Sequence, residues 1–159
     1  MNKADEHRQL ISNFYTAFAN KDSLGMKACY HQHVVFEDPV FGVLKEEEVA
    51  AMWEMLLSRG KDLIITFSDV KADDFTGTAT WVATYTFSRS GRQVINHIQA
   101  QFSFADGKII KHTDSFDLNK WFIMAFGLKG YLFITLPFLR RKFSYTVKQS
   151  LVNYMAKRQ

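Results

Sequence analysis

Apolar residues recur at helical spacing in the first part of the chain. From Asp5 to Ala19 they return every three or four positions, which predicts an amphipathic helix with a buried side made of Leu10, Ile11, Phe14, Tyr15 and Phe18. Asp22 or Ser23 is placed to cap a short second helix that continues to about Tyr30. A third helix fits Lys45 to Arg59, and a glycine follows it as a stop signal.

Strand-forming residues replace this pattern in the second half of the chain. After a brief strand at Val34 to Phe36, four long strands are predicted at Leu63 to Ala72, Thr76 to Ser88, Gln93 to Ala105 and Lys108 to Asp117. Turn-forming pairs separate them, and Asp106-Gly107 has the composition of a tight hairpin turn. Strands longer than the usual five or so residues predict a curved, bulged sheet. The order predicts an α+β fold, in which a curved antiparallel sheet wraps around three N-terminal helices.

The size and composition of the chain indicate one structural domain. Its 159 residues are 47% apolar and 15% aromatic, enough for a substantial buried core. Cys29 is the single cysteine, and the residues after Met1 are polar, so neither a disulfide nor a secretory signal is expected. Both features favour a cytoplasmic location.

Charge is distributed unevenly along the chain. Residues 1–118 carry 12 Lys and Arg against 16 Asp and Glu, whereas residues 119–159 carry eight Lys and Arg and no acid. We therefore expect a domain over residues 1–118 with a net charge of −4, and a basic, apolar helical extension over residues 119–159 with a net charge of +8, packed on it.

Two interpretations of the extension are open. Its apolar part, Trp121 to Leu139, is interrupted by glycine, lysine and proline and makes a poor membrane-spanning helix. It lies either on an anionic membrane surface or over the open end of the domain as a lid. We favour the lid, because the two charges are complementary. The basic residues lack the pattern of a nucleic-acid-binding module, so no nucleic-acid partner is expected.

Asp38 is the first candidate for chemistry. It lies in the run from Phe36 to Gly42, where aromatic residues surround an Asp-Pro step. A carboxyl group held among apolar side chains has its pKa raised toward the range that a general base needs at neutral pH. The structural alternative is an aspartate that accepts backbone N–H groups in an Asx-turn before Gly42.

A second candidate lies on the last predicted strand. Side chains two residues apart share a face of a strand, so one row contains Ile110, His112, Asp114 and Phe116, and the other contains Lys111, Thr113, Ser115 and Asp117. The first row places a titratable pair, His112 and Asp114, between apolar residues, as a proton-transfer site requires. The alternative is a hydrogen-bonded pair that satisfies a partly buried sheet face. On the preceding strand, Asn96 is a polar group in an otherwise apolar row and a candidate oxyanion donor.

A metal or cofactor is not expected. His31 and His33, with Glu37 or Asp38 nearby, are ligand types for zinc or iron, but a lone His-x-His pair has little specificity. The chain has no Gly-rich phosphate loop, nucleophile elbow or metalloprotease motif.

The element order, the chain length and the Glu-Asp-Pro run over residues 37–39 resemble the nuclear transport factor 2-like superfamily. Its members include ketosteroid isomerase, limonene-epoxide hydrolase and the SnoaL-like polyketide cyclases. The resemblance covers roughly residues 5–120. It implies a cone-shaped, cystatin-like roll with a deep hydrophobic pocket, often in a homodimer.

Within the superfamily, the residue pattern resembles the SnoaL-like group most closely. Asp38 falls on the proton-shuttling aspartate of ketosteroid isomerase, but Phe14 and Ala100 stand where that family has its two oxyanion donors. Asp114 falls on a catalytic aspartate of limonene-epoxide hydrolase, but residues 93–98 lack that family's Arg-x-Asp. SnoaL-like cyclases use an acid on the last strand, and Asp114 fits that pattern.

These observations lead to one leading hypothesis and two alternatives. The leading hypothesis is a cofactor-independent isomerase or cyclase acting on a hydrophobic carbonyl compound, with Asp38, His112 and Asp114 as acid-base residues. We expect the ligand to contact Phe14, Tyr15, Phe36, Trp53, Asn96 and Phe116. The alternatives are a non-catalytic binder of a lipid-like ligand or a membrane-peripheral protein, and an enzyme similar to epoxide hydrolases.

Overall fold

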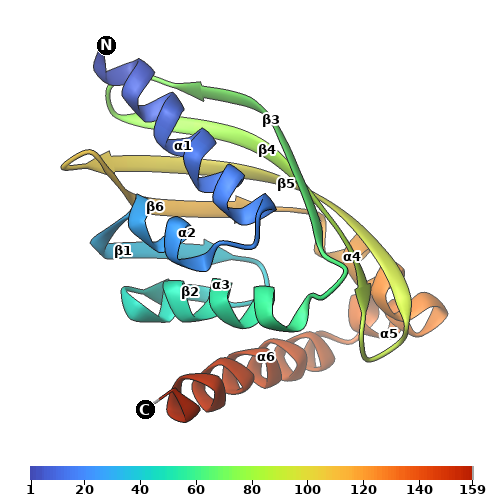
Figure 1. Ribbon diagram of the computed structural model, residues 1–159. Helices are drawn as coiled ribbons and strands as arrows, with labels where there is room; N and C mark the ends of the chain where they lie inside the picture. Colours follow the sequence, from blue (N-terminus) through green and yellow to red (C-terminus); the bar gives the residue numbers. More distant parts are fainter. Residues whose placement is uncertain (159) are drawn as a thin grey trace.

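Six strands form one curved sheet, with three helices packed against its inner face (Figure 1). The structure is a computed structural model and describes residues 1–158. The strands are β1 (Tyr30–Asp38), β2 (Gly42–Lys45), β3 (Ile64–Ala72), β4 (Thr76–Phe87), β5 (Arg92–Ala105) and β6 (Lys108–Ser115), in the spatial order β2-β1-β6-β5-β4-β3. The predicted α+β fold is confirmed.

The three N-terminal helices lie close to their predicted positions. They are α1 (Lys3–Ala19), α2 (Ser23–Cys29) and α3 (Glu47–Arg59). The Asn2 side chain accepts a hydrogen bond from the Asp5 backbone N–H at 2.8 Å, and Asp22 accepts one from Gly25 at 2.9 Å. Because these side chains satisfy N–H groups that a helix start leaves free, they fix where α1 and α2 begin.

Two features of the sheet differ from the sequence-based expectation. β1 begins at Tyr30 and continues to Asp38, and β2 pairs back on its second half, with Phe36 opposite Leu44. Two strands therefore precede α3. In addition, β1 runs parallel to β6, with Phe36 opposite His112, so the sheet is mixed. Both features depend on pairing between distant segments, which the local pattern does not record.

The curvature predicted from the long strands is present. The β3–β4 register shifts between Ser68 and Lys71, and the β5–β6 register shifts between Ser103 and Phe104. Such irregularities bend a strand and increase its twist. The β5–β6 turn has φ of 51° at Asp106 and 71° at Gly107, the two positive angles of a tight primed turn.

Aromatic side chains fill the space between the sheet and the helices. We define the aromatic interior as six buried residues from α1, α3 and three strands: Phe14, Phe18, Phe36, Trp53, Trp81 and Phe102. Their rings meet edge to face, as between Phe18 and Trp53 at 5.0 Å and between Phe36 and Trp53 at 5.4 Å.

The C-terminal extension is helical and packs on the rest of the chain. It consists of α4 (Leu118–Phe126), η1 (Gly127–Lys129), α5 (Gly130–Thr135) and α6 (Pro137–Lys157). The α4 helix lies against β5, and α6 runs beside α3 (Figure 1). Arg158 and Glu54 form an ion pair at 3.0 Å. Within residues 1–158, it is the one ion pair that joins the C-terminal extension, which we also call the tail, to residues 1–118. No helix in that range is long and apolar enough to cross a membrane.

Candidate functional site

A chain of hydrogen bonds runs through the aromatic interior, and we call it the buried chain. Trp53 Nε1 donates to Tyr30 Oη at 2.9 Å, and Tyr30 Oη lies 2.8 Å from His112 Nδ1. His112 Nε2 lies 2.9 Å from Asp114 Oδ1, and the same oxygen accepts from Trp81 Nε1 at 3.2 Å. The predicted contact between His112 and Asp114 is therefore present, with three further residues attached to it.

Strand geometry explains why these groups meet. His112 and Asp114 are 0% and 4% exposed, whereas Lys111 and Ser115 on the other row of β6 are exposed. The neighbouring strands place Phe102 and Phe36 on either side of His112. The row of β6 that contains His112 and Asp114 is thus the buried one, as the alternation of side chains along a strand predicts.

One assignment of protons satisfies every hydrogen-bond donor of the buried chain. An ionised Asp114 accepts hydrogen bonds only, so His112 donates its Nε2–H to it. The neutral imidazole then accepts at Nδ1 from the Tyr30 O–H, and Tyr30 Oη accepts from Trp53. Every donor of the buried chain has an acceptor in this arrangement. Both ring nitrogens of His112 are used, so this residue holds Asp114 in place.

Asp38 ends β1 and forms a tight turn with the residues that follow it. Its Oδ1 accepts from the backbone N–H groups of Val40 at 2.9 Å and Phe41 at 2.6 Å, and Gly42 has a φ of 66°. This is the Asx-turn of the structural interpretation. Burial nevertheless raises the pKa of Asp38 to about 7; the two hydrogen bonds oppose that rise, and the charge of Asp114 adds to it.

Asp38 and Asp114 lie on the same face of neighbouring strands. Phe36 is level with His112 and Glu37 with Thr113 in the parallel β1–β6 pair, so the next step of that register brings Asp38 level with Asp114. Each carboxylate uses Oδ1 for its hydrogen bonds to the protein. Within residues 1–158, Oδ2 of each accepts none, so two acceptor oxygens remain available to a ligand.

Tyr15 supplies a hydroxyl group without a partner. Its side chain is 0% exposed, and its Oη is a buried polar atom that makes no hydrogen bond within residues 1–158. Burial raises the pKa of Tyr15 well above its usual value, and the charge of Asp114 raises it further. The hydroxyl is therefore an unused donor within range of the Asp114 charge, and such an orphan is uncommon in a folded protein.

The remaining residues predicted to bind a ligand are divided between the interior and its edge. Phe14, Phe36 and Trp53 are at most 3% exposed and pack around His112, with the Phe36 ring centre 5.1 Å from the imidazole. Phe116 is half-buried between the aromatic interior and the tail. Asn96 is 8% exposed on β5, four positions before the residue that pairs with Asp114, and does not belong to the buried chain.

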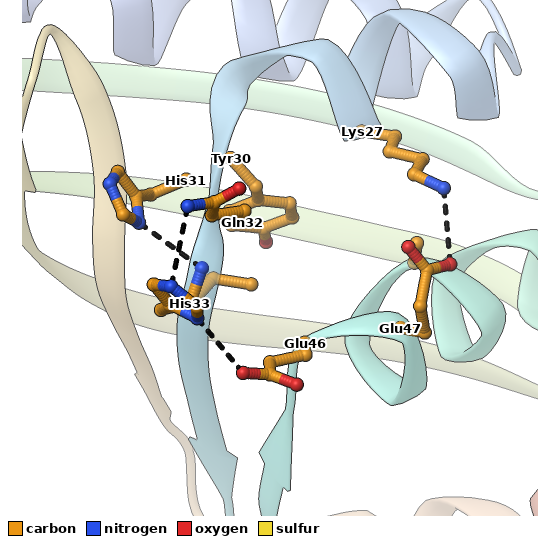
Figure 2. Close-up of a pocket in the computed structure, with 9 residues that line it drawn as sticks. Lys27, Tyr30, His31, Gln32, His33, Glu46 and Glu47 are labelled. Carbon is orange, nitrogen blue, oxygen red and sulfur yellow. Dashed lines mark hydrogen bonds and ion pairs between the residues drawn. The ribbon is translucent and has the colours of Figure 1, made fainter.

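The ligand pocket itself stays a prediction, because the cavities described lie elsewhere. One, of about 400 Å³, is at the surface beside β1 and α3, and Tyr30 forms part of its wall (Figure 2). The other, of about 300 Å³, is on the outer face of β4, β5 and β6. Neither Asp38 nor Asp114 lines either cavity.

The His31 and His33 side chains at the first cavity are engaged with acids. His31 Nε2 lies 3.1 Å from Asp106, and His33 Nδ1 lies 3.0 Å from Glu46 (Figure 2). Within residues 1–158, no group of three or more His, Cys, Asp or Glu side chains is arranged to hold a metal ion.

Family comparison agrees with this arrangement of helices and sheet. The family model of the SnoaL-like domain matches residues 11–112. The chain belongs to the SnoaL-like family. The resemblance inferred from sequence is therefore confirmed. The region of this SnoaL-like protein that the family model matches ends at His112, two residues before Asp114. No curated protein matches it in sequence.

Solved structures share the fold of this SnoaL-like protein at low sequence identity. A candidate SnoaL-like polyketide cyclase from Jannaschia superposes with a TM-score of 0.70 at 12% identity, over 80% of this chain and 96% of its own. An LEH-like epoxide hydrolase from M. tuberculosis superposes with a TM-score of 0.67 at 18% sequence identity. The superposition covers 86% of this chain and 99% of that enzyme. A candidate polyketide cyclase from Xanthomonas campestris superposes with a TM-score of 0.63 at 18% sequence identity. The superposition covers 78% of this chain and 99% of the cyclase. The homodimer implied by the resemblance stays a prediction.

Proposed function

We propose that this protein is a cofactor-independent isomerase or cyclase that moves a proton on a hydrophobic carbonyl compound. The observation that carries the proposal is the pair of carboxylates, half-buried Asp38 and buried Asp114, side by side on the sheet with one free oxygen each. Neighbouring carboxyl groups with different surroundings can divide the roles of base and fixed charge. The pKa of about 7 for Asp38 suits a group that both takes and returns a proton near neutrality.

Each residue has a defined role in the proposed reaction. Asp38 Oδ2 removes a proton from the carbon next to the carbonyl group, and the electron pair of that C–H bond moves onto the carbonyl oxygen. The Tyr15 hydroxyl donates a hydrogen bond to the resulting enolate oxygen. Protonated Asp38 then returns the proton to another carbon, giving an isomer. In a cyclisation, the enolate carbon attacks a second carbonyl group, and Asp38 protonates the new alkoxide.

His112 and Tyr30 act as positioning residues in this proposal. They hold Asp114 through the buried chain, and the Asp114 charge helps to keep the pKa of Asp38 raised. Asp114 Oδ2 is a second free acceptor next to the substrate. This division of roles refines the expectation that His112 and Asp114 exchange the proton themselves.

The C-terminal extension covers the end of the sheet where both carboxylates lie. Val40, which lies in the turn that Asp38 begins, and Phe116, two residues after Asp114, both pack against a core cluster that contains Trp121, Phe122 and Phe143 of the extension. We propose that this part of the tail is a lid, and that its displacement opens the aromatic interior. Exclusion of water strengthens the electrostatic interactions in such a site.

Proton exchange in D2O tests the proposal without knowledge of the natural substrate. We expect the protein to catalyse α-deuteration of one or more hydrophobic ketones in a panel followed by NMR. The rate should rise with pH and level off above about 7, where Asp38 is ionised. Ketones that bind without exchange would contradict the proposal and favour a non-catalytic binder. Hydrolysis of hydrophobic epoxides without ketone exchange would favour the epoxide hydrolase alternative.

Tyr15→Phe separates the proposed role of the Tyr15 hydroxyl from a structural one. We expect exchange to fall by about a hundredfold or more, because an oxyanion donor is lost. The free energy of unfolding should stay the same or increase by up to about 1 kcal/mol, because the hydroxyl has no partner to lose. Exchange kinetics and urea unfolding measure the two effects.

Tyr85→Phe is the matched control for this variant. Tyr85 Oη accepts from Trp121 Nε1 at 2.8 Å, so its removal should cost about 1 kcal/mol of stability and leave exchange within a few-fold. Unchanged exchange in Tyr15→Phe would remove Tyr15 from the mechanism.

A further inference from the structure

The tail presents a cluster of apolar side chains to solvent. Between Leu128 and Phe138, five large apolar residues are 37–87% exposed, and we call them the α5 patch: Leu128, Tyr131, Leu132, Leu136 and Phe138. The patch lies at the end of the molecule where α4 and α5 meet the turn between β4 and β5 (Figure 1). Contiguous exposed apolar side chains mark an interaction site more often than single ones do.

The α5 patch is centred on a short helix whose other side is firmly packed. Phe133 stacks on Phe122 and on Phe126, each with ring centres 4.7 Å apart. Gly130 is buried, and a Cβ atom there would overlap the Phe122 carbonyl group. The segment is therefore apolar both toward the protein and toward solvent. A helix that is apolar all round is normally covered on every side.

The charged residues within and directly after the α5 patch are all positive. Lys129 lies within it, and Arg141 and Lys142 follow it on α6, all three exposed. Within residues 1–158, none of the three makes an ion pair. Arg89, at the turn between β4 and β5, lies 5.7 Å from the Phe126 ring and adds a fourth cation. Since residues 119–159 contain no acid, the complementary surface carries negative charge.

A second copy of the chain that meets this surface through its own α5 patch is disfavoured. Two copies meeting through the α5 patch would bring together two segments with a net charge of +8 each, and like charges at an interface disfavour association. An anionic lipid bilayer offers an apolar interior to the exposed apolar side chains and negatively charged headgroups to the cations. Tyrosine is favoured at the headgroup level of a bilayer, and leucine and phenylalanine just below it.

We propose that the α5 patch docks this protein on the surface of an anionic membrane, with the leucines and Phe138 inserted at the boundary between headgroups and acyl chains. The inner sides of α4 and α6 remain packed on the domain, so docking and the proposed lid use opposite sides of the tail. The proposal does not depend on proton transfer, because vesicle binding is measured without a substrate.

Co-sedimentation with vesicles tests the proposal on the full chain. We expect binding to phosphatidylcholine vesicles that contain about a third phosphatidylglycerol, and much weaker binding to phosphatidylcholine alone. Because a high salt concentration shortens the Debye length, about 1 M salt should weaken binding strongly. Equal binding to both kinds of vesicle, or no binding to either, would overturn the proposal.

Two pairs of variants assign the binding to the α5 patch. Each basic residue near an anionic bilayer raises partitioning about fivefold, so Lys142→Glu should lower it roughly 30-fold. Phe138→Ser should lower it about tenfold. Lys71→Glu and Phe75→Ser change an exposed lysine and an exposed phenylalanine on and beside β3, away from the patch, and should leave binding unchanged. Equal losses in the patch variants and their controls would contradict the assignment, as would a dimer in solution that Phe138→Ser dissociates.

Discussion

Asp38→Asn is expected to reduce catalysed proton exchange by at least about a thousandfold, because the amide cannot take up the substrate proton. The same variant should be more stable than the natural protein above about pH 7. Asparagine keeps an oxygen for the Val40 and Phe41 N–H groups, but it carries no charge that burial would penalise. Loss of activity together with a gain of stability is typical of residues selected for function.

The pH dependence of this gain follows from the two pKa values of the carboxyl group. In the unfolded chain Asp38 ionises near 3.8, and in the folded protein near 7. Between these values the folded protein binds more protons, so the contribution of Asp38 to stability falls as pH rises and is lost above the folded value. The shift of about three units corresponds to about 4 kcal/mol, or nearer 2 kcal/mol once partial solvent contact is allowed for.

Urea unfolding at about pH 4 and about pH 8 measures the difference between Asp38→Asn and the natural protein. Asp73→Asn is the matched control, because Asp73 also accepts two backbone N–H groups in a turn, at 2.7 Å each, but at the surface. Its hydrogen bonds lower the pKa of Asp73, so the substitution should not stabilise the protein at either pH. Equal exchange rates in Asp38→Asn and the natural protein would end the assignment of Asp38 as the base.

His112→Phe should destabilise the protein by about 3–5 kcal/mol. The imidazole is fully buried, and its loss leaves the Tyr30 hydroxyl without an acceptor and the Asp114 carboxylate without its nearest donor. Removing one member of a buried polar pair costs much more than removing both. Urea unfolding monitored by tryptophan fluorescence is a suitable measurement, because Trp53 and Trp81 both belong to the buried chain.

The double variant His112→Phe/Asp114→Leu distinguishes a lost partner from a steric effect. It should be less destabilised than the sum of the two single variants by at least about 1 kcal/mol, because no unpaired carboxylate remains. His33→Phe is the surface control: His33 pairs with Glu46 at 3.0 Å but is exposed, so its loss should cost less than about 0.5 kcal/mol. Simple additivity of the two buried substitutions would show that the pair is not coupled.

The sequence was sufficient where local pattern determines structure. Helical spacing located α1 and α3, and alternation along β6 identified which side of the strand His112 and Asp114 face. The aromatic interior followed from the density of apolar residues on these faces. The Asx-turn at Asp38 was visible because its hydrogen bonds join residues two and three positions apart.

The sequence was insufficient where the structure depends on distant pairing. Tyr30 was expected to end the second helix, and its contact with His112 exists because β1 pairs in parallel with β6. Trp53 and Trp81 were missed as donors for the same reason, although a buried indole N–H generally requires an acceptor. That requirement is the signal that could have pointed to them. Tyr15 was expected to contact the ligand, but only the structure shows that its hydroxyl lacks a partner.

The parallel pairing of β1 with β6 also determines when the site can form during synthesis. Tyr30 and His112 are 82 residues apart, so the contact between them requires closure of a long loop and waits until β6 has left the ribosome. At about 5–20 residues per second, the aromatic side chains of α1 and α3 remain exposed to water for several seconds on the growing chain. The strand that carries Asp114 is therefore also the one whose arrival closes the aromatic interior.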